Sequence, residues 1–310
     1  MTGTVQIVEV GPRDGLQAES AVLPVGDRAE MVLRLAAAGA ERIEAVSFVH
    51  PDRVPQMADA EAVLDTIRSS DRLGPTRLIG LVLNGRGLRR ALDSGVHEVN
   101  LVVAATDGFA LANQGRPVEA LVDECRELVD LARGAGLPTS VTISTSFGCP
   151  YEGEVPVTRL VEVVSDLVEV SAPDELALAD SIGVAVPRDV TERLDAVSSV
   201  IDGGGVRLRC HFHDTRNTAI ANVVAALQWG VRTFDASVGG LGGCPFAPGA
   251  TGNLATEDLL YVLGRSGWSA GIDPERLVEL TPWLEGRIGH ELPSALSHSG
   301  GFPSPRPVTD

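Results

Sequence analysis

The sequence predicts an α/β fold of the (β/α)8 TIM-barrel class with additional C-terminal helices, and two observations support this prediction. Eight short apolar segments alternate with amphipathic segments of helical spacing over about 250 residues, which is the pattern of such a barrel. The competing fold, an open doubly wound sheet, would more often carry a Gly-x-Gly-x-x-Gly turn after its first strand. The sequence has Gly11-Pro12-Arg13-Asp14-Gly15 at that position, so the barrel is favoured.

The predicted strands are short, apolar and partly β-branched, as expected for strands that are buried on both faces. In chain order they are Val5–Val10, Arg42–Val46, Arg77–Val82, Glu98–Val103, Thr139–Ser144, Glu175–Ala179, Val206–Phe212 and Thr233–Ser237. Helical segments separate them, so we expect neighbouring strands to be parallel.

Between the strands lie segments whose apolar residues recur at helical spacing, which predicts an outer layer of helices. The clearest are Asp27–Ala38, Gly87–Leu92, Val118–Ala135, Thr158–Ser171, Arg188–Val200 and Thr218–Trp229. Glycines follow several of these segments and are expected at helix C-caps, namely Gly39, Gly95, Gly136 and Gly230.

The chain has 310 residues and is 44% hydrophobic, which is enough for one large buried core. We expect the barrel to occupy residues 1–265, followed over residues 266–300 by a helical extension that packs on it. Residues 301–310 begin with the run Gly301-Phe302-Pro303-Ser304-Pro305 and are expected to form a flexible tail.

The composition excludes several classes of function. A formal net charge of −17 argues against a nucleic-acid partner, and all 25 basic residues are arginine, so a lysine Schiff base is impossible. No apolar run reaches the roughly 20 residues of a membrane helix, and no secretory signal is visible. The four cysteines are widely spaced, so we expect reduced thiols and a cytoplasmic location.

Polar residues gather where the predicted strands end. The carboxyl ends of the strands carry the chemistry of such barrels, and many ionisable groups there would be costly without a function. In chain order these residues are Arg13, Asp14, Glu44, Ser47, Asn84, Asp180, His211, His213, Asp214 and Ser237.

The run His211-Phe212-His213 suggests a metal site. Strand alternation places both imidazoles on one face, while Asp14 and Asn253 could add a carboxylate oxygen and an amide oxygen. This set contains no thiolate, so octahedral Mg²⁺ or Mn²⁺ is favoured over Zn²⁺. Four protein ligands would leave two octahedral positions for the oxygens of a chelating substrate.

The sequence leaves two alternatives open for these residues. The two histidines could instead line a packed barrel through hydrogen bonds to Asp180 or Glu44. Arg13 could hold a developing oxyanion, or it could balance the charge of Glu44 or Asp180, and the two roles are compatible.

The loop before Cys244 has four glycines in the five preceding residues. Such a loop could close over a site as a lid, and the thiol could act as a proton donor at neutral pH. The alternative is an inert loop thiol. Among the other cysteines, Cys149 is a candidate rim residue, whereas Cys210 is expected to pack behind its strand and Cys125 lies in a predicted helix.

The sequence resembles the 3-hydroxy-3-methylglutaryl-CoA lyases, within a larger group of metal-dependent barrel lyases and acyl transferases. The resemblance extends from about Val5 to Leu263 and rests on specific motifs. These are Val8–Gln17, Ser47–Val49, Val54–Met57, Gly148–Gly153, His211–Thr215 and Gly240–Asp258, the last of which reads GLGGCPFAPGATGNLATED.

The resemblance implies a retro-Claisen cleavage of a 3-hydroxyacyl-CoA that carries a second carboxylate. His211 or Asp14 would remove the hydroxyl proton. Arg13 would stabilise the enolate of acetyl-CoA, and Cys244 would protonate it. By their positions in the motifs, the implied metal ligands are Asp14, His211, His213 and Asn253, and the implied supporting acids are Glu44 and Asp180. The candidate substrate-binding residues are Gln17, Ser47, Asn84 and Arg216.

Departures from the family pattern leave the acyl group open. Ala177 and Ala179 stand where a serine and a glycine are common, and Arg216-Asn217-Thr218 stands where a tyrosine-glycine-glutamine run is common. Pro282 falls near an asparagine that contacts the acyl group in some members. Citramalyl-CoA or a longer 3-hydroxy-3-alkylglutaryl-CoA is therefore an alternative substrate. Arg216 either adds positive charge near the mouth or lies on the barrel wall.

Two other functions are compatible with the fold. One is an acetyl-CoA-dependent condensation that makes 2-alkylmalates, against which the lyase-like Gly239–Cys244 loop argues. The other is an inactive barrel that binds metal or acyl-CoA, and the full set of chemical residues argues against it, namely Arg13, Asp14, His211, His213, Cys244 and Asn253. For a member of this family we also expect a homo-oligomer.

Overall fold

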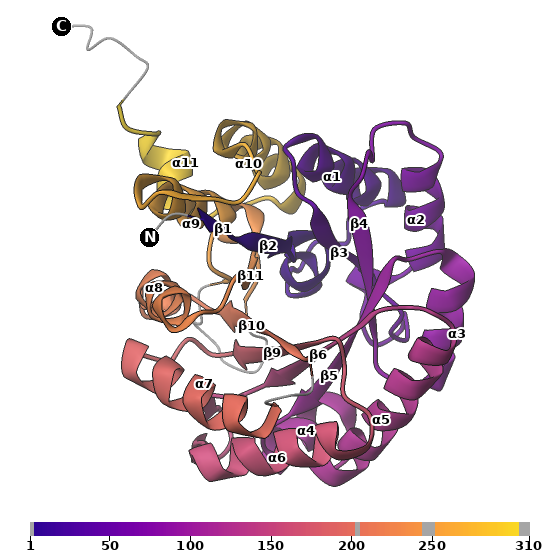
Figure 1. Cartoon of the computed structure of the whole chain (residues 1–310). Coiled ribbons are helices and arrows are strands. Elements are labelled where there is room, and N and C mark those ends of the chain that lie inside the picture. Colours follow the sequence, from indigo (N-terminus) through magenta and orange to yellow (C-terminus); the bar gives the residue numbers. More distant parts are fainter. Residues whose placement is uncertain (1–2, 202–204, 244–251, 304–310) are drawn as a thin grey trace, which may run out of the picture.

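Parallel strands close into a barrel in the computed structural model, which describes residues 3–201, 205–243 and 252–303 (Figure 1). The barrel strands are β2 (Gln6–Glu9), β3 (Arg42–Ser47), β4 (Arg77–Val82), β5 (Glu98–Ala104), β6 (Thr139–Ser144), β9 (Glu175–Asp180), β10 (Arg207–Phe212) and β11 (Thr233–Ala236). Around the barrel their order is β10-β11-β2-β3-β4-β5-β6-β9, and β9 pairs with β10 to close it. All eight predicted strands are present, and the predicted fold class is confirmed.

Helices surround the barrel and cover the outer faces of its strands (Figure 1). They are α1 (Val25–Ala37), α2 (Ala60–Arg68), α3 (Gly85–Ser94), α4 (Asp107–Gln114), α5 (Val118–Gly134), α6 (Val157–Val170), α7 (Pro187–Ile201), α8 (Ala219–Trp229) and α9 (Thr256–Arg265). The six segments predicted as helices form α1, α3, α5, α6, α7 and α8, while α2, α4 and α9 are additional. In α4, Phe109 and Ala110 are the buried residues, so its amphipathic pattern is weak.

The inner face of the barrel is largely polar, a feature that the apolar character of the strands did not predict. The guanidinium of Arg42 lies between two carboxylates, with Nη2 at 2.5 Å from Oε1 of Glu98 and 2.8 Å from Oε2 of Glu175. Further toward the carboxyl ends of the strands, Nε of Arg209 lies 3.4 Å from Oδ1 of Asp235. A buried ionic network therefore occupies part of the barrel interior, and the buried apolar residues form one large cluster and a small second one of Val8, Val10 and Ile79.

The chain beyond the barrel packs back on it. β12 (Trp268–Ser269) pairs in parallel with β1 (Gly3–Thr4), and α10 (Pro274–Ile288) lies beside α1 (Figure 1). Helix α11 (Ala295–Ser299) begins at the carboxylate of Asp258, which accepts hydrogen bonds from the N–H groups of Ala295 and Leu296 at 2.9 and 2.7 Å.

A short hairpin lies outside the barrel sheet. After β6, the strands β7 (Gly148–Cys149) and β8 (Gly153–Glu154) form an antiparallel hairpin. Of the helices in the described part of the chain, none has the length and apolar character that crossing a membrane requires. In the predicted tail, residues 304–310 lie outside the described residues.

Candidate active site

A tight turn brings Arg13 and Asp14 to the carboxyl end of β2. The turn, η1 (Gly11–Gly15), is π-helical, and the carbonyl of Val10 accepts hydrogen bonds from the N–H groups of Arg13, Asp14 and Gly15 at 3.2, 2.8 and 3.2 Å. Pro12 suits the start of such a turn because it needs no amide partner there. The turn therefore presents a guanidinium and a carboxylate side by side at the rim of the barrel.

Three predicted metal ligands converge at this rim. Asp14, His211 and His213 each offer one ligand atom, and these atoms lie within 4.8 Å of one another. The two imidazole centroids are 5.1 Å apart, and Nε2 of His211 lies 4.0 Å from Oδ2 of Asp14. Strand alternation thus places both rings as the sequence predicts.

Asn253, the fourth predicted ligand, is held beside the other three. It forms an isolated antiparallel bridge with His213. Its Nδ2 donates hydrogen bonds to Oδ2 of Asp14 at 2.9 Å and to the carbonyl of Leu241 at 3.2 Å. Both hydrogens of the amide are engaged, which leaves the amide oxygen as an acceptor.

Unpaired polar atoms show that these residues fit a cation. Oδ1 of Asn253 and Nδ1 of His213 are buried and have no hydrogen-bond partner among the described residues. Buried polar atoms are nearly always paired, so an orphaned acceptor indicates a missing ligand or ion. Two imidazoles, a carboxylate and an amide oxygen form a set that a hard divalent cation accepts.

The electrostatics of the site favour the unprotonated form of Asp14 and His213 but the protonated form of His211. Burial lowers the pKa of His213 to about 4, and His211 acts in the same direction. Burial opposes ionisation of Asp14, but Arg13 and the two histidines hold the pKa of its carboxyl well below the usual range. For His211, burial lowers the pKa, but the hydrogen bond to Asp235 and the negative charges of Asp14 and Asp235 together raise it above its ordinary value.

Arg13 is fixed by two carboxylates. Its Nε and Nη2 donate to Oε2 of Glu44 at 2.8 and 2.6 Å, and its Nη1 donates to Oδ1 of Asp14 at 2.8 Å. Of the two partners that the sequence left open, Glu44 is the one that binds Arg13. A guanidinium held in this way is pre-oriented to stabilise an anion that develops beside it.

Asp180 and Asn84 are engaged by nearby backbone. The carboxylate of Asp180 accepts hydrogen bonds from the N–H groups of Val184 and Ala185 at 3.0 and 2.9 Å, and burial raises its pKa. Oδ1 of Asn84 accepts from the N–H of Gly87 at 3.0 Å and caps α3. These contacts give both residues a role in shaping loops, and their predicted parts in catalysis and substrate binding stay predictions.

The alternative in which the histidines bind Asp180 or Glu44 is not observed among the described residues. In residues 3–201, 205–243 and 252–303, no side-chain hydrogen bond joins either imidazole to Glu44 or Asp180. The acid that does bind is Asp235, whose Oδ2 lies 3.1 Å from Nδ1 of His211.

The other predicted substrate-binding residues differ in their burial and in their hydrogen-bond partners. Oε1 of Gln17 and Oγ of Ser47 are buried and have no hydrogen-bond partner in the described part of the chain. Arg216 is exposed, and its Nη1 donates to the carbonyls of Ile182 and Gly183 at 3.1 and 2.8 Å. It therefore joins the loops that follow β9 and β10.

Cys244 lies outside the described residues, but the start of its loop is visible. Gly239 has a φ of +68°, and its N–H donates to both carboxylate oxygens of Glu257 at 2.9 Å. A Cβ at Gly239 would collide with the side chain of Leu292, so glycine is required there. Cys149, another candidate, is buried and accepts a hydrogen bond from Oγ1 of Thr106 at 3.1 Å.

Sequence reasoning missed the residues that support the site from inside the barrel. Arg209 stands two positions before His211 and shares its strand face, so alternation alone could have found it. Asp235 and Asn100 are buried polar residues inside apolar strands, and Glu9 is a buried acid in β2.

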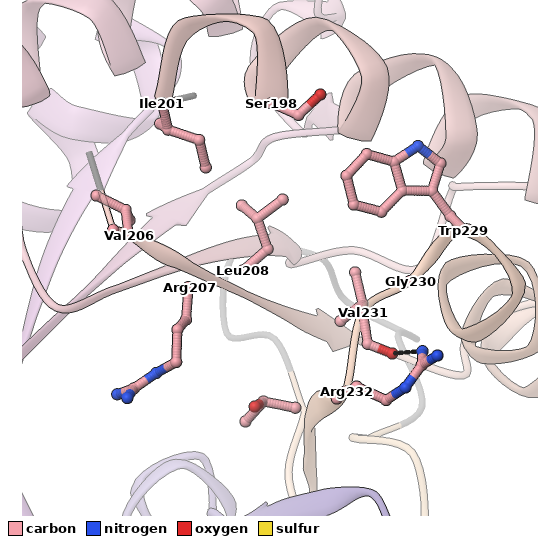
Figure 2. A pocket seen from close by; sticks show the side chains of 11 residues that line it. Ser198, Ile201, Val206, Arg207, Leu208, Trp229, Gly230, Val231 and Arg232 are labelled. Carbon is pink, nitrogen blue, oxygen red and sulfur yellow. Dashed lines mark hydrogen bonds between the residues drawn. The ribbon is translucent and has the colours of Figure 1, made fainter. Parts of the chain in front are cut away.

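A cavity of about 410 Å³ lies at the other end of the barrel (Figure 2). It is lined by the starts of β10 and β11 and by the ends of α7 and α8, including Arg207, Leu208 and Trp229. Arg232 at its edge donates to the carbonyl of Val231 at 2.8 Å. Because the candidate site lies at the carboxyl ends of the strands, this cavity is not part of it.

Comparisons with known proteins point to the same site. Residues 4–283 match the family described as HMGL-like. The chain is 39% identical over 290 residues to hydroxymethylglutaryl-CoA lyase YngG of Bacillus subtilis, covering 94% of this chain and 95% of that protein. It is 41% identical over 304 residues to (R)-citramalyl-CoA lyase of Chloroflexus aurantiacus, covering 96% and 95%.

A solved structure shares the whole architecture. An HMG-CoA lyase from Acinetobacter baumannii, in complex with coenzyme A and 3-methylmalate, matches with a TM-score of 0.90 and 35% identity, covering 99% of this chain and 98% of that one. The fold, the site and the relatives together define a carbon–carbon lyase on a (β/α)8 barrel. The chain belongs to the HMGL-like family, and the predicted resemblance to hydroxymethylglutaryl-CoA lyases is confirmed.

Proposed function

We propose that this chain is a divalent-metal-dependent lyase that cleaves 3-hydroxy-3-methylglutaryl-CoA to acetyl-CoA and acetoacetate. The observation that carries this proposal is the convergence of Asp14, His211 and His213 within 4.8 Å. This cluster lies directly beside Arg13, which forms an ion pair of 2.8 Å with Asp14. The coenzyme A in a solved relative supports an acyl-CoA substrate.

We assign Mg²⁺ or Mn²⁺ to Asp14, His211, His213 and Asn253. The absence of sulfur from this set and the orphaned amide oxygen of Asn253 support a hard cation. When bound, the cation would chelate the tertiary hydroxyl and the free carboxylate of the substrate and lower the pKa of that hydroxyl.

The chain's own residues would then move the protons. Of the two candidate bases, His211 would use its only lone pair on the cation, so Asp14 is the one that accepts the proton of the tertiary hydroxyl, and the C2–C3 bond breaks as the ketone of acetoacetate forms. The electron pair of that bond passes to the enolate of acetyl-CoA. Arg13, already held by Glu44, faces this negative charge without having to reorient. Cys244 protonates the enolate carbon, a role assigned from its place in the family motif.

Gln17 and Ser47 are proposed to bind the acyl part of the substrate. Both carry a buried oxygen that has no partner among the described residues. Arg216 is proposed to add a positive charge at the mouth, because it is tied to the rim loop of residues 182 and 183 and stays exposed.

The second candidate function is cleavage of citramalyl-CoA to acetyl-CoA and pyruvate. It is favoured by the relative named (R)-citramalyl-CoA lyase, which is as similar to this chain as the hydroxymethylglutaryl-CoA lyases. The same residues would perform the chemistry, and only the acyl pocket would differ. Ala177, which is fully buried on β9, offers no hydroxyl to an acyl group.

A substrate panel tests these proposals. Purified protein with Mg²⁺ or Mn²⁺ is incubated with 3-hydroxy-3-methylglutaryl-CoA, both enantiomers of citramalyl-CoA and a longer 3-hydroxy-3-alkylglutaryl-CoA, and acetyl-CoA release is measured. We expect the highest kcat/KM with the first substrate and complete loss after EDTA treatment. A preference for citramalyl-CoA would select the second candidate. Metal binding without turnover of any 3-hydroxyacyl-CoA would overturn both, and condensation of acetyl-CoA with 2-oxoacids would indicate a synthase.

We also propose a cytoplasmic location and a homo-oligomeric state. Cys125, Cys149 and Cys210 are buried free thiols, which supports a reducing compartment. Cell fractionation and light scattering of the purified protein test these two points.

A further inference from the structure

We infer that Asp235, held in place by Arg209, is a positioning residue that sets the tautomer of His211 and so presents its Nε2 lone pair toward Asp14. This inference rests on the proposed function, because it concerns how the candidate cation site is prepared.

The register of two neighbouring strands places the pair. His211 on β10 lies opposite Asp235 on β11. Nδ1 of His211 lies 3.1 Å from Oδ2 of Asp235, and the other ring nitrogen lies 4.0 Å from Oδ2 of Asp14. The imidazole therefore bridges a buried carboxylate inside the barrel and the ligand cluster at its rim.

The chemistry of a carboxylate decides where the imidazole proton lies. An ionised carboxylate only accepts hydrogen bonds, so the hydrogen bond to Asp235 requires the proton on Nδ1 of His211. Nε2 is then left with its lone pair, in the form that a cation binds. The opposite tautomer would direct an N–H toward the ligand cluster and block it.

Because Arg209 lies beside residue 235, only a carboxylate at that position gives this tautomer of His211. The Arg209 side chain is 1% exposed, and each of its three nitrogens lies near a polar partner, with Nη2 near both Asn100 and Thr142. Nε lies 3.4 Å from Oδ1 of Asp235, Nη1 lies 3.5 Å from Oε2 of Glu175, and Nη2 donates to Oδ1 of Asn100 at 3.4 Å. The guanidinium therefore lies in ion-pair contact, without a hydrogen bond from Nε, with the oxygen of Asp235 that His211 does not use.

An amide at position 235 would consequently present a donor to His211 instead of an acceptor. In Asp235→Asn, the amide oxygen is attracted to Nε of Arg209, and the NH₂ group faces His211. His211 must then accept at Nδ1 and carry its proton on Nε2. The substitution thus preserves shape and volume but reverses the tautomer.

The experiment measures Mn²⁺ binding by electron paramagnetic resonance on metal-free full-length protein. Asp235→Asn is expected to weaken Mn²⁺ binding by about 10- to 100-fold. Glu98→Gln is the matched control, because it also changes a buried carboxylate of the same network to an amide but contacts Arg42 rather than His211. Its Mn²⁺ affinity should stay within about two-fold. Unchanged binding in Asp235→Asn, or an equal loss in Glu98→Gln, would overturn the inference.

A second measurement leaves the hydrogen bonds between His211, Asp235 and Arg209 unchanged. Wild-type protein labelled with ¹⁵N-histidine, free of metal and at a pH where the rings are neutral, reports the tautomer of each ring, and His211→Gln identifies the relevant signal. We expect the proton of His211 on Nδ1, and a proton on Nε2 would contradict the inference. If wild-type protein binds no Mn²⁺ at all, the proposed function fails, while the tautomer measurement still decides this inference.

Discussion

Nδ2 of Asn100 donates a hydrogen bond of 3.0 Å to Oε1 of Glu44 inside the barrel. The other carboxylate oxygen of Glu44 holds Arg13. Asn100 cannot rotate freely, because its Oδ1 accepts hydrogen bonds from the hydroxyl groups of Ser140 and Thr142 at 3.2 and 3.1 Å. The direction of the guanidinium at the rim thus depends on an amide on β5.

Replacing Asn100 should slow turnover without removing the metal site. In Asn100→Leu, the branched shape of the side chain is kept but Oε1 of Glu44 loses its donor, so Arg13 shifts. We expect kcat to fall by about 10- to 100-fold, because small misplacements of an active-site group have effects of this size. Mn²⁺ affinity should change little. Ser140→Ala is the control, since it also loses a bond to Asn100 but leaves Glu44 paired. Equal kcat in Asn100→Leu and wild type would refute the prediction.

Arg13→Met should separate turnover from metal binding. The guanidinium is expected to act on the enolate rather than on the cation, so kcat should fall by about 10²- to 10³-fold. Mn²⁺ binding should stay within a few-fold of wild type. Arg193→Met serves as control, because Arg193 is also buried but donates to the backbone carbonyls of Ser146 and Val155. Loss of metal together with activity in Arg13→Met would show a structural role instead.

Cys244→Ala should abolish most turnover if this thiol protonates the enolate. Loss of a positioned proton donor is expected to lower kcat by about 10²- to 10⁴-fold. Cys125→Ala is the matched control, because burial in α5 raises the pKa of Cys125 to about 12 and makes this thiol unreactive. Product formation from 3-hydroxy-3-methylglutaryl-CoA measures both variants. An active Cys244→Ala protein would require a different proton donor.

Glu9 should make the protein less stable as pH rises. Burial raises the pKa of its carboxyl from an ordinary 4.5 to about 7, against hydrogen bonds from Thr256, Val238 and Gly11. A raised pKa means that this contribution to the free energy of unfolding is complete below about pH 4.5 and is lost as the pH passes about 7. The total loss is about 3 kcal/mol.

Urea unfolding of wild type and Glu9→Gln at several pH values tests this effect. A glutamine resembles the protonated acid, so the two proteins should have similar stability at pH 5 or below. At pH 8 and above, Glu9→Gln should be more stable by up to about 3 kcal/mol. Parallel stability profiles for the two proteins would mean that Glu9 is not the titrating group.

Gly252→Ala should damage the metal site through the backbone. An added Cβ would collide with the carbonyl oxygens of Gly240 and Gly242, so residue 252 must move and carry Asn253 with it. Both the melting temperature and the Mn²⁺ affinity should fall. Gly264→Ala is the control, because Gly264 lies in α9 with open space around it, and alanine there is expected to stabilise the helix by up to about 1 kcal/mol. Wild-type Mn²⁺ binding in Gly252→Ala would contradict this account.

Local pattern was enough to predict the barrel and the centre of its site. The eight strands could be read from short apolar segments, and the alternation of His211 and His213 placed two candidate ligands on one face. The contacts that the sequence did not predict are those that form only when the sheet closes. Arg209 faces Glu175 on one neighbouring strand and Asp235 on the other, and only the strand order brings these charges together.

The roles of Asn84 and Asp180 show a second limit. Asn84 follows β4 and Asp180 ends β9, and each accepts backbone N–H groups of the next loop or helix through its side-chain oxygens, while their catalytic and substrate-binding roles stay predictions. Short polar side chains often make such local bonds, and sequence position does not distinguish them from groups that face a substrate. Helix α4 was missed for a simpler reason, since little of it is buried.

The side-chain amide of Asn253 donates a hydrogen bond to the carbonyl of Leu241. This bond joins the residues that precede and follow the segment 244–251. A loop whose ends are already joined can be lengthened cheaply, since doubling its length costs only about 0.6 kcal/mol of closure entropy. We therefore expect the protein to tolerate grafted segments of different length and sequence between residues 243 and 252. Chimaeras of this kind could exchange the proposed proton donor while Asp14, His211, His213 and Asn253 stay in place.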